Sequence, residues 1–264
     1  MRFKILLRSD KLPLIYRHIF MSMIKEALKQ SNPDYKDKLY PDKNFEKTKV
    51  AKPFTFSIMM PPGRKLETGT IDINGKTITD KIFYYPEGSY LSFLLSSSDY
   101  EFVMNLYNGL IKMKRFEYSS DIKFEYLKSM LLNEKDITEN EITFKTLSPI
   151  LVENKNEKPV LPIQESLQNF NDELNIIQDK IFKDVRGFGL KSRLNLTPLN
   201  IRKQVVKHTL RGFREKTGRD YMTLTCFEGT FKLQGSPEDL HLLYQTGIGL
   251  RTGQGFGMVE VASE

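Results

Sequence analysis

The stretch GIGLRTGQGFGMVEV, residues 247–261, holds five of the chain's 16 glycines within eleven residues. Apolar spacing predicts a short helix before it, over 237–247, and a closing strand within FGMVEVA after it. Glycines permit positive φ and let backbone N–H groups approach a large anion without Cβ atoms in the way. The stretch therefore indicates either an anion-binding loop or a tightly packed helix-to-strand connection.

Two common nucleotide-binding motifs do not fit this stretch. Counted from Gly247, Thr252 stands where a dinucleotide-binding motif needs its third glycine. The complete G-x-x-x-x-G-K-[ST] pattern of nucleotide hydrolases is not found in the sequence. The glycines therefore need another explanation.

The bulk composition is that of a folded, basic protein. The 264 residues are 39% hydrophobic and 28% charged, with a formal net charge of +7. Such a charge favours a polyanionic partner, nucleic acid before an anionic membrane surface. A single cysteine, Cys226, excludes an intramolecular disulfide and is expected to be a buried thiol. No segment resembles a signal peptide or a membrane span, so we expect a cytoplasmic protein without a membrane partner.

Periodic apolar residues predict two similar successions of elements. Strands are expected over 2–9, 52–60, 89–97, 141–153, 200–213 and 221–236, and helices over 18–30, 99–113, 161–183 and 237–247. Asn74-Gly75 indicates a hairpin turn, and Ser97 or Ser98 is the expected N-cap of the helix at 99–113.

The two halves also share a local pattern. A strand, a polar cap and a helix ending in LYNG at 106–109 match a strand, a cap and a helix ending in LYQTG at 243–247. We predict an α+β protein of two tandem ferredoxin-like (βαββαβ) domains with antiparallel sheets and a C-terminal glycine-rich loop. The polar segment 133–140 places the boundary, giving domains at 1–136 and 137–264.

The segment 191–220 is the most basic part of the chain. It holds nine Lys and Arg residues against Glu215 and Asp220. If 200–213 is a strand, Lys203, Lys207 and Arg211 share one face, because side chains alternate with period two. Such a row suits RNA phosphates, since A-form RNA is read mainly through shape and backbone. A solvated hairpin face that discourages aggregation is the alternative.

The glycine-rich stretch, in its sequence context, resembles a known family. GIGLRTGQGFGMV is similar to the C-terminal loop of the CRISPR-associated endoribonucleases that cut precursor CRISPR RNA, members of the repeat-associated RNA-binding superfamily. The resemblance spans nearly the whole chain and includes MRFKILL at 1–7, KPFTFS at 52–57, TLSPILV at 146–152 and FKLQGSPEDLHLLYQTGIG at 231–249. It implies tandem ferredoxin-like folds, with catalytic residues in the N-terminal domain and RNA binding in the C-terminal one.

The resemblance also implies residue roles. RNA contacts are expected from Arg193, Lys203, Lys207, Arg211 and Arg251, and from the loop glycines at 247, 249, 253, 255 and 257 (Gly247, Gly249, Gly253, Gly255 and Gly257). The glycines would clear room for an RNA backbone or pack the loop against the other domain. His208, within the basic segment, is expected to face RNA or solvent.

The expected catalytic positions depart from the family pattern. Many members carry a tyrosine in the first helix, a histidine after it and a lysine before the FTFS-like strand. Lys52 matches the lysine, but the histidine position holds Tyr40 and the tyrosine position holds Lys25. Lys52 could stabilise the phosphorane while Lys25, with a lowered pKa, or Tyr40 moves protons. His18 lies two turns before Lys25, about 10 Å along the helix, where a structural role is favoured over catalysis.

Together with these residues, the resemblance implies a metal-independent endoribonuclease. It would bind CRISPR repeat RNA and cut precursor CRISPR RNA by 2′-OH attack, leaving 2′,3′-cyclic phosphate and 5′-OH ends, without a cofactor. A non-cleaving RNA-binding subunit of a CRISPR effector complex is the alternative, and a scaffold for proteins or small molecules is a third. Besides precursor and mature repeat RNA, other effector subunits and a second copy of the chain are expected partners.

Overall fold

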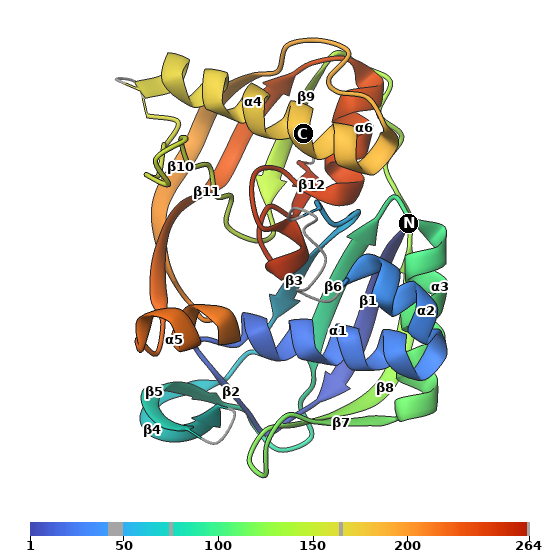
Figure 1. Ribbon diagram of the computed structural model, residues 1–264, viewed down its shortest axis with the longest axis vertical. Helices are drawn as coiled ribbons and strands as arrows, with labels where there is room; N and C mark the ends of the chain where they lie inside the picture. Colours follow the sequence, from blue (N-terminus) through green and yellow to red (C-terminus); the bar gives the residue numbers. More distant parts are fainter. Residues whose placement is uncertain (42–49, 74–75, 164–165, 263–264) are drawn as a thin grey trace.

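The computed structural model describes residues 1–41, 50–73, 76–163 and 166–262. Two antiparallel sheets, one above the other in Figure 1, are each covered on one face by helices, with the glycine-rich loop between them. This mixed architecture confirms the predicted α+β class. The predicted turn at Asn74-Gly75 lies outside the described residues.

The N-terminal unit is a βαββαβ fold with additions. Its principal elements are β1 (Arg2–Arg8), α1 (Arg17–Ser31), β3 (Phe54–Met59), β6 (Leu91–Ser97), α3 (Tyr100–Met113) and β8 (Lys123–Leu132). The strand order is β3-β6-β1-β8, extended at one edge by β7 (Arg115–Glu117). All pairs are antiparallel, so the first and last strands lie side by side in the middle of the sheet.

Close packing of α1 on α3 covers this sheet. The buried side of α1 is the one that the helical apolar spacing predicts, and it includes Ile19, Met23 and Ala27. A Cβ atom at Gly109 would lie 1.8 Å from Ala27 O, so the helix crossing needs a glycine there. The cap of α3 is Asp99, which accepts from Phe102 N (3.1 Å); the predicted serine cap is wrong.

The C-terminal unit repeats the same topology. Its principal elements are β9 (Glu141–Thr146), α4 (Leu167–Arg186), β10 (Asn195–His208), β11 (Met222–Gln234), α6 (Pro237–Thr246) and β12 (Val259–Val261). The order β10-β11-β9-β12 places the four strands as β3-β6-β1-β8 does in the first unit. Residues 133–140 connect the two sheets. Identical order in two sheets confirms the predicted tandem ferredoxin-like arrangement.

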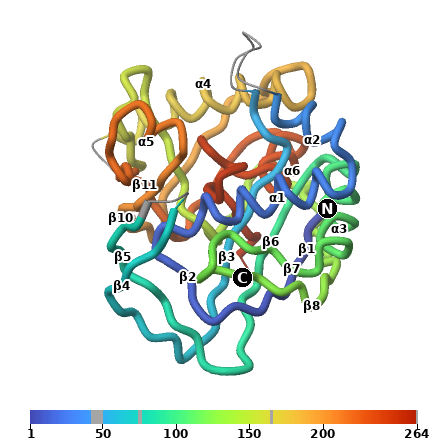
Figure 2. Tube along the Cα trace, turned by 60° about the horizontal axis from the view of Figure 1, so that its bottom comes forward, coloured from blue at the N-terminus to red at the C-terminus, as the bar shows by residue number. Residues whose placement is uncertain are grey.

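Three additions decorate these units. A small sheet, β2-β5-β4, combines β2 (Lys11–Pro13), β4 (Lys65–Ile73) and β5 (Lys76–Tyr84), and α2 (Pro33–Leu39) follows α1. The predicted strand 200–213 is partly wrong, because β10 ends at His208 and α5 (Arg211–Thr217) forms the connection to β11. Figure 1 shows α5 at the far end of the long β10–β11 hairpin, beside β4 and β5, and Figure 2 shows α5 above the same two strands.

Candidate active site and nucleic-acid interface

The glycine-rich loop is packed inside the protein. All five of its glycines are buried. A Cβ atom at Gly253 would lie 2.8 Å from Cγ of Lys52, and one at Gly255, where φ is +86°, would lie 2.6 Å from the Phe56 ring. The missing side chains therefore make room for β3 and for the residues just before it. Of the two roles expected for these glycines, RNA contact and packing against the other domain, the structure shows the packing role.

Hydrogen bonds fix this loop on the N-terminal unit. The Thr55 hydroxyl donates to Phe256 O (2.8 Å), and Nε of Arg17 donates to Gly255 O (3.2 Å). Both bonds are buried, where an unsatisfied carbonyl would be destabilising. These bonds connect the loop of the second unit to β3 and to the start of α1 in the first unit.

Three of the predicted catalytic residues meet beside this loop. Lys25 projects from α1, Tyr40 follows the last residue of α2, and Lys52 precedes β3. The Nζ atoms of Lys25 and Lys52 lie 4.8 and 4.9 Å from the centroid of the Tyr40 ring. Both distances suit cation–π attraction. We call these three residues the lysine–tyrosine cluster.

Burial and neighbouring positive charge lower the pKa of both amines in this cluster. Partial burial lowers the pKa of Lys25, and the nearby Lys36 lowers it further. Burial and then the charge of Lys25 lower the pKa of Lys52, an effect that Asp184 opposes. A lysine with a lowered pKa has a larger neutral fraction near pH 8 and is a better proton acceptor at that pH. Lys52 also donates a hydrogen bond to Leu39 O, which orients its ammonium.

Tyr40 contributes its ring rather than its hydroxyl. The hydroxyl oxygen is buried and has no hydrogen-bond partner within the described part of the chain. Burial raises the pKa of Tyr40 well above its ordinary value, so the phenol stays protonated at any pH near neutral. The ring thus holds two ammonium groups close together, and its hydroxyl is not available as a base.

His18 lies apart from this cluster, in the first turn of α1. Its side chain is buried and stacks edge-on against Tyr118 at 5.3 Å. Neither ring nitrogen has a hydrogen-bond partner among the residues described. Burial, followed by the charge of Arg214, lowers the pKa of His18 to about 4. A neutral, enclosed ring fits the structural role favoured from the sequence.

His208 is buried as well, so the expectation that it faces RNA or solvent is wrong. Only 1% of its surface is exposed, and its Nε2 lies 2.9 Å from Gln254 Oε1 in the glycine-rich loop. Burial, with the charges of Arg17 and then Arg251, lowers the pKa of His208 to about 3. We call His18 and His208 the histidine pair, since His18 is one of the groups that lower the pKa of His208.

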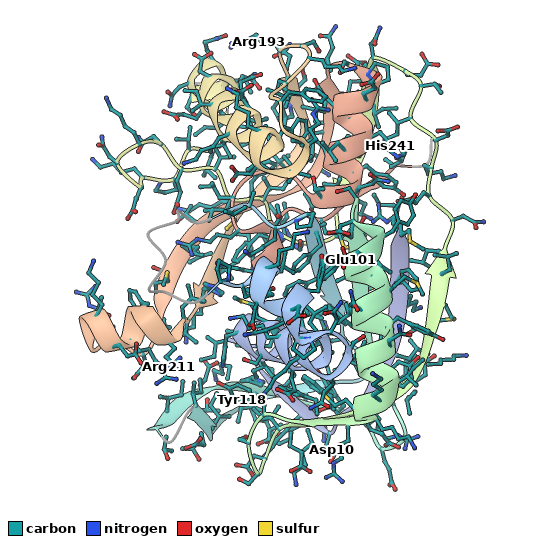
Figure 3. All side chains as sticks on the ribbon, turned by 45° about the vertical axis from the view of Figure 1, so that its right-hand side comes forward. Asp10, Glu101, Tyr118, Arg193, Arg211 and His241 are labelled. Atoms are coloured by element: carbon teal, nitrogen blue, oxygen red, sulfur yellow. The ribbon has the colours of Figure 1, made fainter. Side chains whose placement is uncertain are left out.

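The predicted row of cations is broken up in the structure. Lys203 is exposed on β10, but Lys207 on the same strand pairs with Asp80 of β5 (3.2 Å). Arg211 is not on this strand face, because it begins α5, where it pairs with Glu215 (2.7 Å). Arg193 pairs with Asp172 at the opposite end of the C-terminal unit, far from Arg211 in Figure 3.

An unpredicted polar cavity of about 200 Å³ lies between the two units. Its lining includes Arg17 from α1, Ser57 from β3, Ser148 from the segment after β9, and Gln204 and Glu228 from the β10–β11 hairpin. The Arg17 guanidinium lies 4.7 Å from the centroid of the Phe256 ring. No local signal separates Arg17 from the other arginines of the chain, because its neighbours are set by packing between the units.

Two other features bear on function. Among the described residues no group of three or more His, Cys, Asp and Glu side chains is placed to hold a metal ion. No described helix is long and apolar enough to cross a membrane. Cys226 is fully buried, as expected, and burial raises the pKa of its thiol to about 12.

Comparison with known proteins connects the fold and the site to a family. Residues 132–261 match the family model described as CRISPR associated protein Cas6, C-terminal. The CRISPR-associated endoribonuclease Cas6 1 of Methanocaldococcus jannaschii is 24% identical over 267 residues, which cover 98% of this chain and 92% of the relative. The CRISPR-associated endoribonuclease Cas6 of Pyrococcus furiosus is 28% identical over 258 residues, covering 96% and 85%.

Solved structures show the same fold. The chain is similar to the product of a Cas6-related gene from Pyrococcus furiosus, with a TM-score of 0.74, 22% identity and coverage of 100% of this chain and 99% of that one. A RAMP protein that binds different RNA substrates has the same TM-score at 21% identity, with 100% of both chains covered. Fold and site thus define a tandem ferredoxin-like protein whose glycine-rich loop faces a cluster of cations. The C-terminal part of the chain matches the Cas6 family, and over nearly its whole length the chain is similar to CRISPR-associated endoribonucleases named Cas6.

Proposed function

We propose that this protein binds CRISPR repeat RNA and cuts precursor CRISPR RNA without a metal, by attack of the 2′-OH on the adjacent phosphate. The observation that carries the proposal is the lysine–tyrosine cluster, in which two ammonium groups share one aromatic ring beside the glycine-rich loop. A charged lysine beside a second amine suits a reaction that needs a proton acceptor and whose transition state carries extra negative charge on phosphate oxygens.

The reaction itself needs only proton transfer and charge stabilisation. The 2′-oxygen forms a bond to phosphorus and loses its proton to a base, while the bond from phosphorus to the 5′-oxygen breaks and that oxygen gains a proton. The products are a 2′,3′-cyclic phosphate and a 5′-OH end. One positioned acid or base typically contributes about 10²–10⁴-fold to such a rate.

The lowered lysine pKa values suggest a division of roles. We assign the base to Lys25, because it is an exposed residue whose pKa is reduced. We assign stabilisation of the phosphorane to Lys52, whose hydrogen bond to Leu39 O and contact with Gly253 fix its position. Tyr40 positions both amines through its ring, and His18 takes no part in proton transfer.

The RNA would approach along the exposed cations of the β10–β11 hairpin. Lys203 and Arg211 are exposed there, and Arg211 lies on α5 at the hairpin's end. Arg251, in the glycine-rich loop, is half-exposed and carries the RNA path toward the lysine–tyrosine cluster. The five glycines support this path by packing, and Arg193 lies outside it.

One observation favours a second function, that of a non-cleaving RNA-binding subunit. The position where many relatives carry histidine holds Tyr40, whose hydroxyl is buried and whose raised pKa disfavours proton transfer near neutral pH. In that case the cluster would bind a phosphate without acting on it.

Cleavage of the host's repeat RNA in EDTA tests the proposal. We expect a single cut that a 2′-deoxy substitution before the scissile phosphate abolishes, with a cyclic phosphate on the upstream product. Salt-dependent binding without any cleavage would support the non-cleaving subunit. Cleavage of the 2′-deoxy RNA would overturn the proposed chemistry.

A further inference from the structure

The second unit holds the backbone just before Lys52. Residues 50–53 belong to no helix or strand, so local structure does not fix the position of this lysine. The N–H of Ala51 donates a hydrogen bond to Oδ2 of Asp184 in α4 (3.0 Å), 133 residues further along the chain. A Cβ atom at Gly253 would lie within 2.9 Å of both Cβ and Cγ of Lys52. The C-terminal unit therefore packs against the Lys52 side chain and also anchors the peptide that precedes it.

Asp184 differs from the other aspartates of α4. Asp172 pairs with Arg193 and Asp179 pairs with Lys183, so both neutralise cations of their own unit. Asp184 lies in the last turn of α4, where the negative end of the helix dipole disfavours an acidic side chain. Its position is therefore not explained by the helix itself, and its hydrogen bond leads to the other unit.

The two amines of the lysine–tyrosine cluster have different charged neighbours. Burial lowers the pKa of Lys25, and the positive charge of Lys36 in α2 lowers it further. Burial and the charge of Lys25 lower the pKa of Lys52, whereas the carboxylate of Asp184 raises it. Tyr40 presents a neutral ring to both amines. Among the residues that the structure describes, a negative charge thus acts on Lys52 and a second positive charge acts on Lys25.

We propose that Asp184 is a positioning residue for Lys52, which fixes the peptide before this lysine and keeps its amine the charged member of the cluster. The inference rests on the proposed function, in which Lys52 stabilises the phosphorane and Lys25 accepts a proton. A group that stabilises negative charge must carry its proton, whereas a base must have lost it. Two amines on one ring need a source of asymmetry to divide these roles, and a carboxylate beside one of them supplies it.

Two substitutions separate the hydrogen bond of Asp184 from its charge. Asp184→Asn keeps an oxygen that can accept from the Ala51 N–H and removes the charge, while Asp184→Ala removes both. The matched control is Glu173→Gln, which removes a carboxylate from the same helix about 16 Å away along its axis. Circular dichroism melts verify that each variant is folded.

The charge of Lys52 is measured without RNA, by NMR of the full chain labelled with ¹³C-lysine. The Cε signal of Lys52, assigned with the Lys52→Arg variant, is followed from about pH 7 to pH 11. We expect its titration midpoint to move by about half a pH unit toward acid in Asp184→Asn and to stay unchanged in Glu173→Gln. The shift should become smaller in about 0.5 M NaCl, because salt screens the charge of an exposed carboxylate.

Single-turnover cleavage of repeat RNA then tests the consequence for the reaction. The rate should fall at high pH as Lys52 loses its proton, and this fall should begin about half a pH unit lower in Asp184→Asn than in the wild type. Asp184→Ala should in addition slow cleavage at pH 8 by about three- to tenfold, because Lys52 is held less firmly against the scissile phosphate.

Either of two results would overturn the inference. One is a Lys52 titration that is the same in Asp184→Asn and in the wild type. The other is cleavage by Asp184→Ala that stays within about twofold of the wild type at pH 8. Because the NMR titration involves no RNA, a shifted Lys52 signal in a protein that cuts no RNA would contradict the proposed function and support the effect of Asp184 on Lys52.

Discussion

The lysine–tyrosine cluster and the histidine pair place titratable residues in opposite settings. In the cluster, the amines of Lys25 and Lys52 crowd around one ring, and Lys25 is open to solvent. In the pair, His18 and His208 carry the residue type best suited to acid–base catalysis near neutral pH, yet both are buried and held neutral. Access and charge, rather than residue type, separate a candidate catalytic group from a structural one.

The comparison also separates two uses of the glycine-rich loop. Toward the cluster, Gly253 allows Lys52 to approach the backbone closely. Toward the histidine pair, Gln254 forms a hydrogen bond with the buried His208 ring. One loop therefore builds an open site on one side and a closed core on the other.

Replacing Lys52 should cause the largest loss of cleavage and so separate the lysine–tyrosine cluster most clearly from the histidine pair. We expect Lys52→Ala to slow single-turnover cleavage of repeat RNA by about 10²–10³-fold, the usual loss when one transition-state charge contact is removed. Binding of the RNA, measured by gel shift at the same salt, should weaken far less. The matched control is Lys203→Ala, which replaces an exposed lysine on β10. In this variant RNA binding should weaken, while the cleavage rate of RNA that is already bound should stay unchanged. Equal losses for both variants would contradict a specific role for Lys52.

Replacing Lys25 should change the pH dependence. If its neutral amine is the base, cleavage rises with pH until the lowered pKa of Lys25 is passed, since the neutral fraction rises with pH. Lys25→Met should lower the rate by about 10²-fold and remove this rising limb. Single-turnover cleavage rates of both proteins from pH 6 to pH 10 measure this pH dependence. If the cleavage rate of Lys25→Met still rises with pH in the same way, the base is another group.

The histidine pair should affect stability in acid rather than activity. The folded-state pKa of His18, about 4, lies below its ordinary value of 6.5, so the unfolded chain binds more protons between these values. Stability is therefore full above about pH 6.5 and falls as the pH drops toward 4, by of the order of 1–3 kcal/mol for this residue.

Thermal melts at pH 7.5 and 5 measure this effect. His18→Phe keeps an aromatic ring against Tyr118 and removes the titration, so we expect its melting temperature to fall less between the two pH values than that of the wild type. Cleavage at pH 7.5 should stay within about threefold. A tenfold loss of cleavage in a folded His18→Phe variant would show that His18 takes part in catalysis.

Removing the Tyr40 hydroxyl should have the smallest effect. Tyr40→Phe keeps the ring under both ammonium groups and removes a buried hydroxyl without a partner in the described residues. We expect cleavage within about threefold of wild type and a melting temperature that is unchanged or slightly higher. Tyr40→Ala, which removes the ring, is the contrasting variant and should lower the rate more than tenfold. A large loss in Tyr40→Phe would make the hydroxyl a proton carrier.

Local patterns were sufficient for most of the fold. The helical apolar spacing of 18–30 identified α1, and the predicted α3 starts and ends within one residue of the observed helix. The prediction failed where basic residues interrupt an apolar pattern. The segment 200–213 reads as one strand, but α5 begins at Arg211, where Phe213 N bonds back to Leu210 O (3.1 Å).

The sequence by itself determined the class of fold, the succession of two βαββαβ units and the presence of a glycine-rich loop before the last strand. These features depend on periodicity and on turn residues, which act over a few positions of the chain. Only the tertiary structure decided which charged residues meet. Gly253 lies 201 residues from Lys52 along the chain and touches it, whereas Arg193 and Arg211 share one basic segment and lie at opposite ends of the C-terminal unit. Such meetings depend on how the two units pack, and no local pattern encodes them.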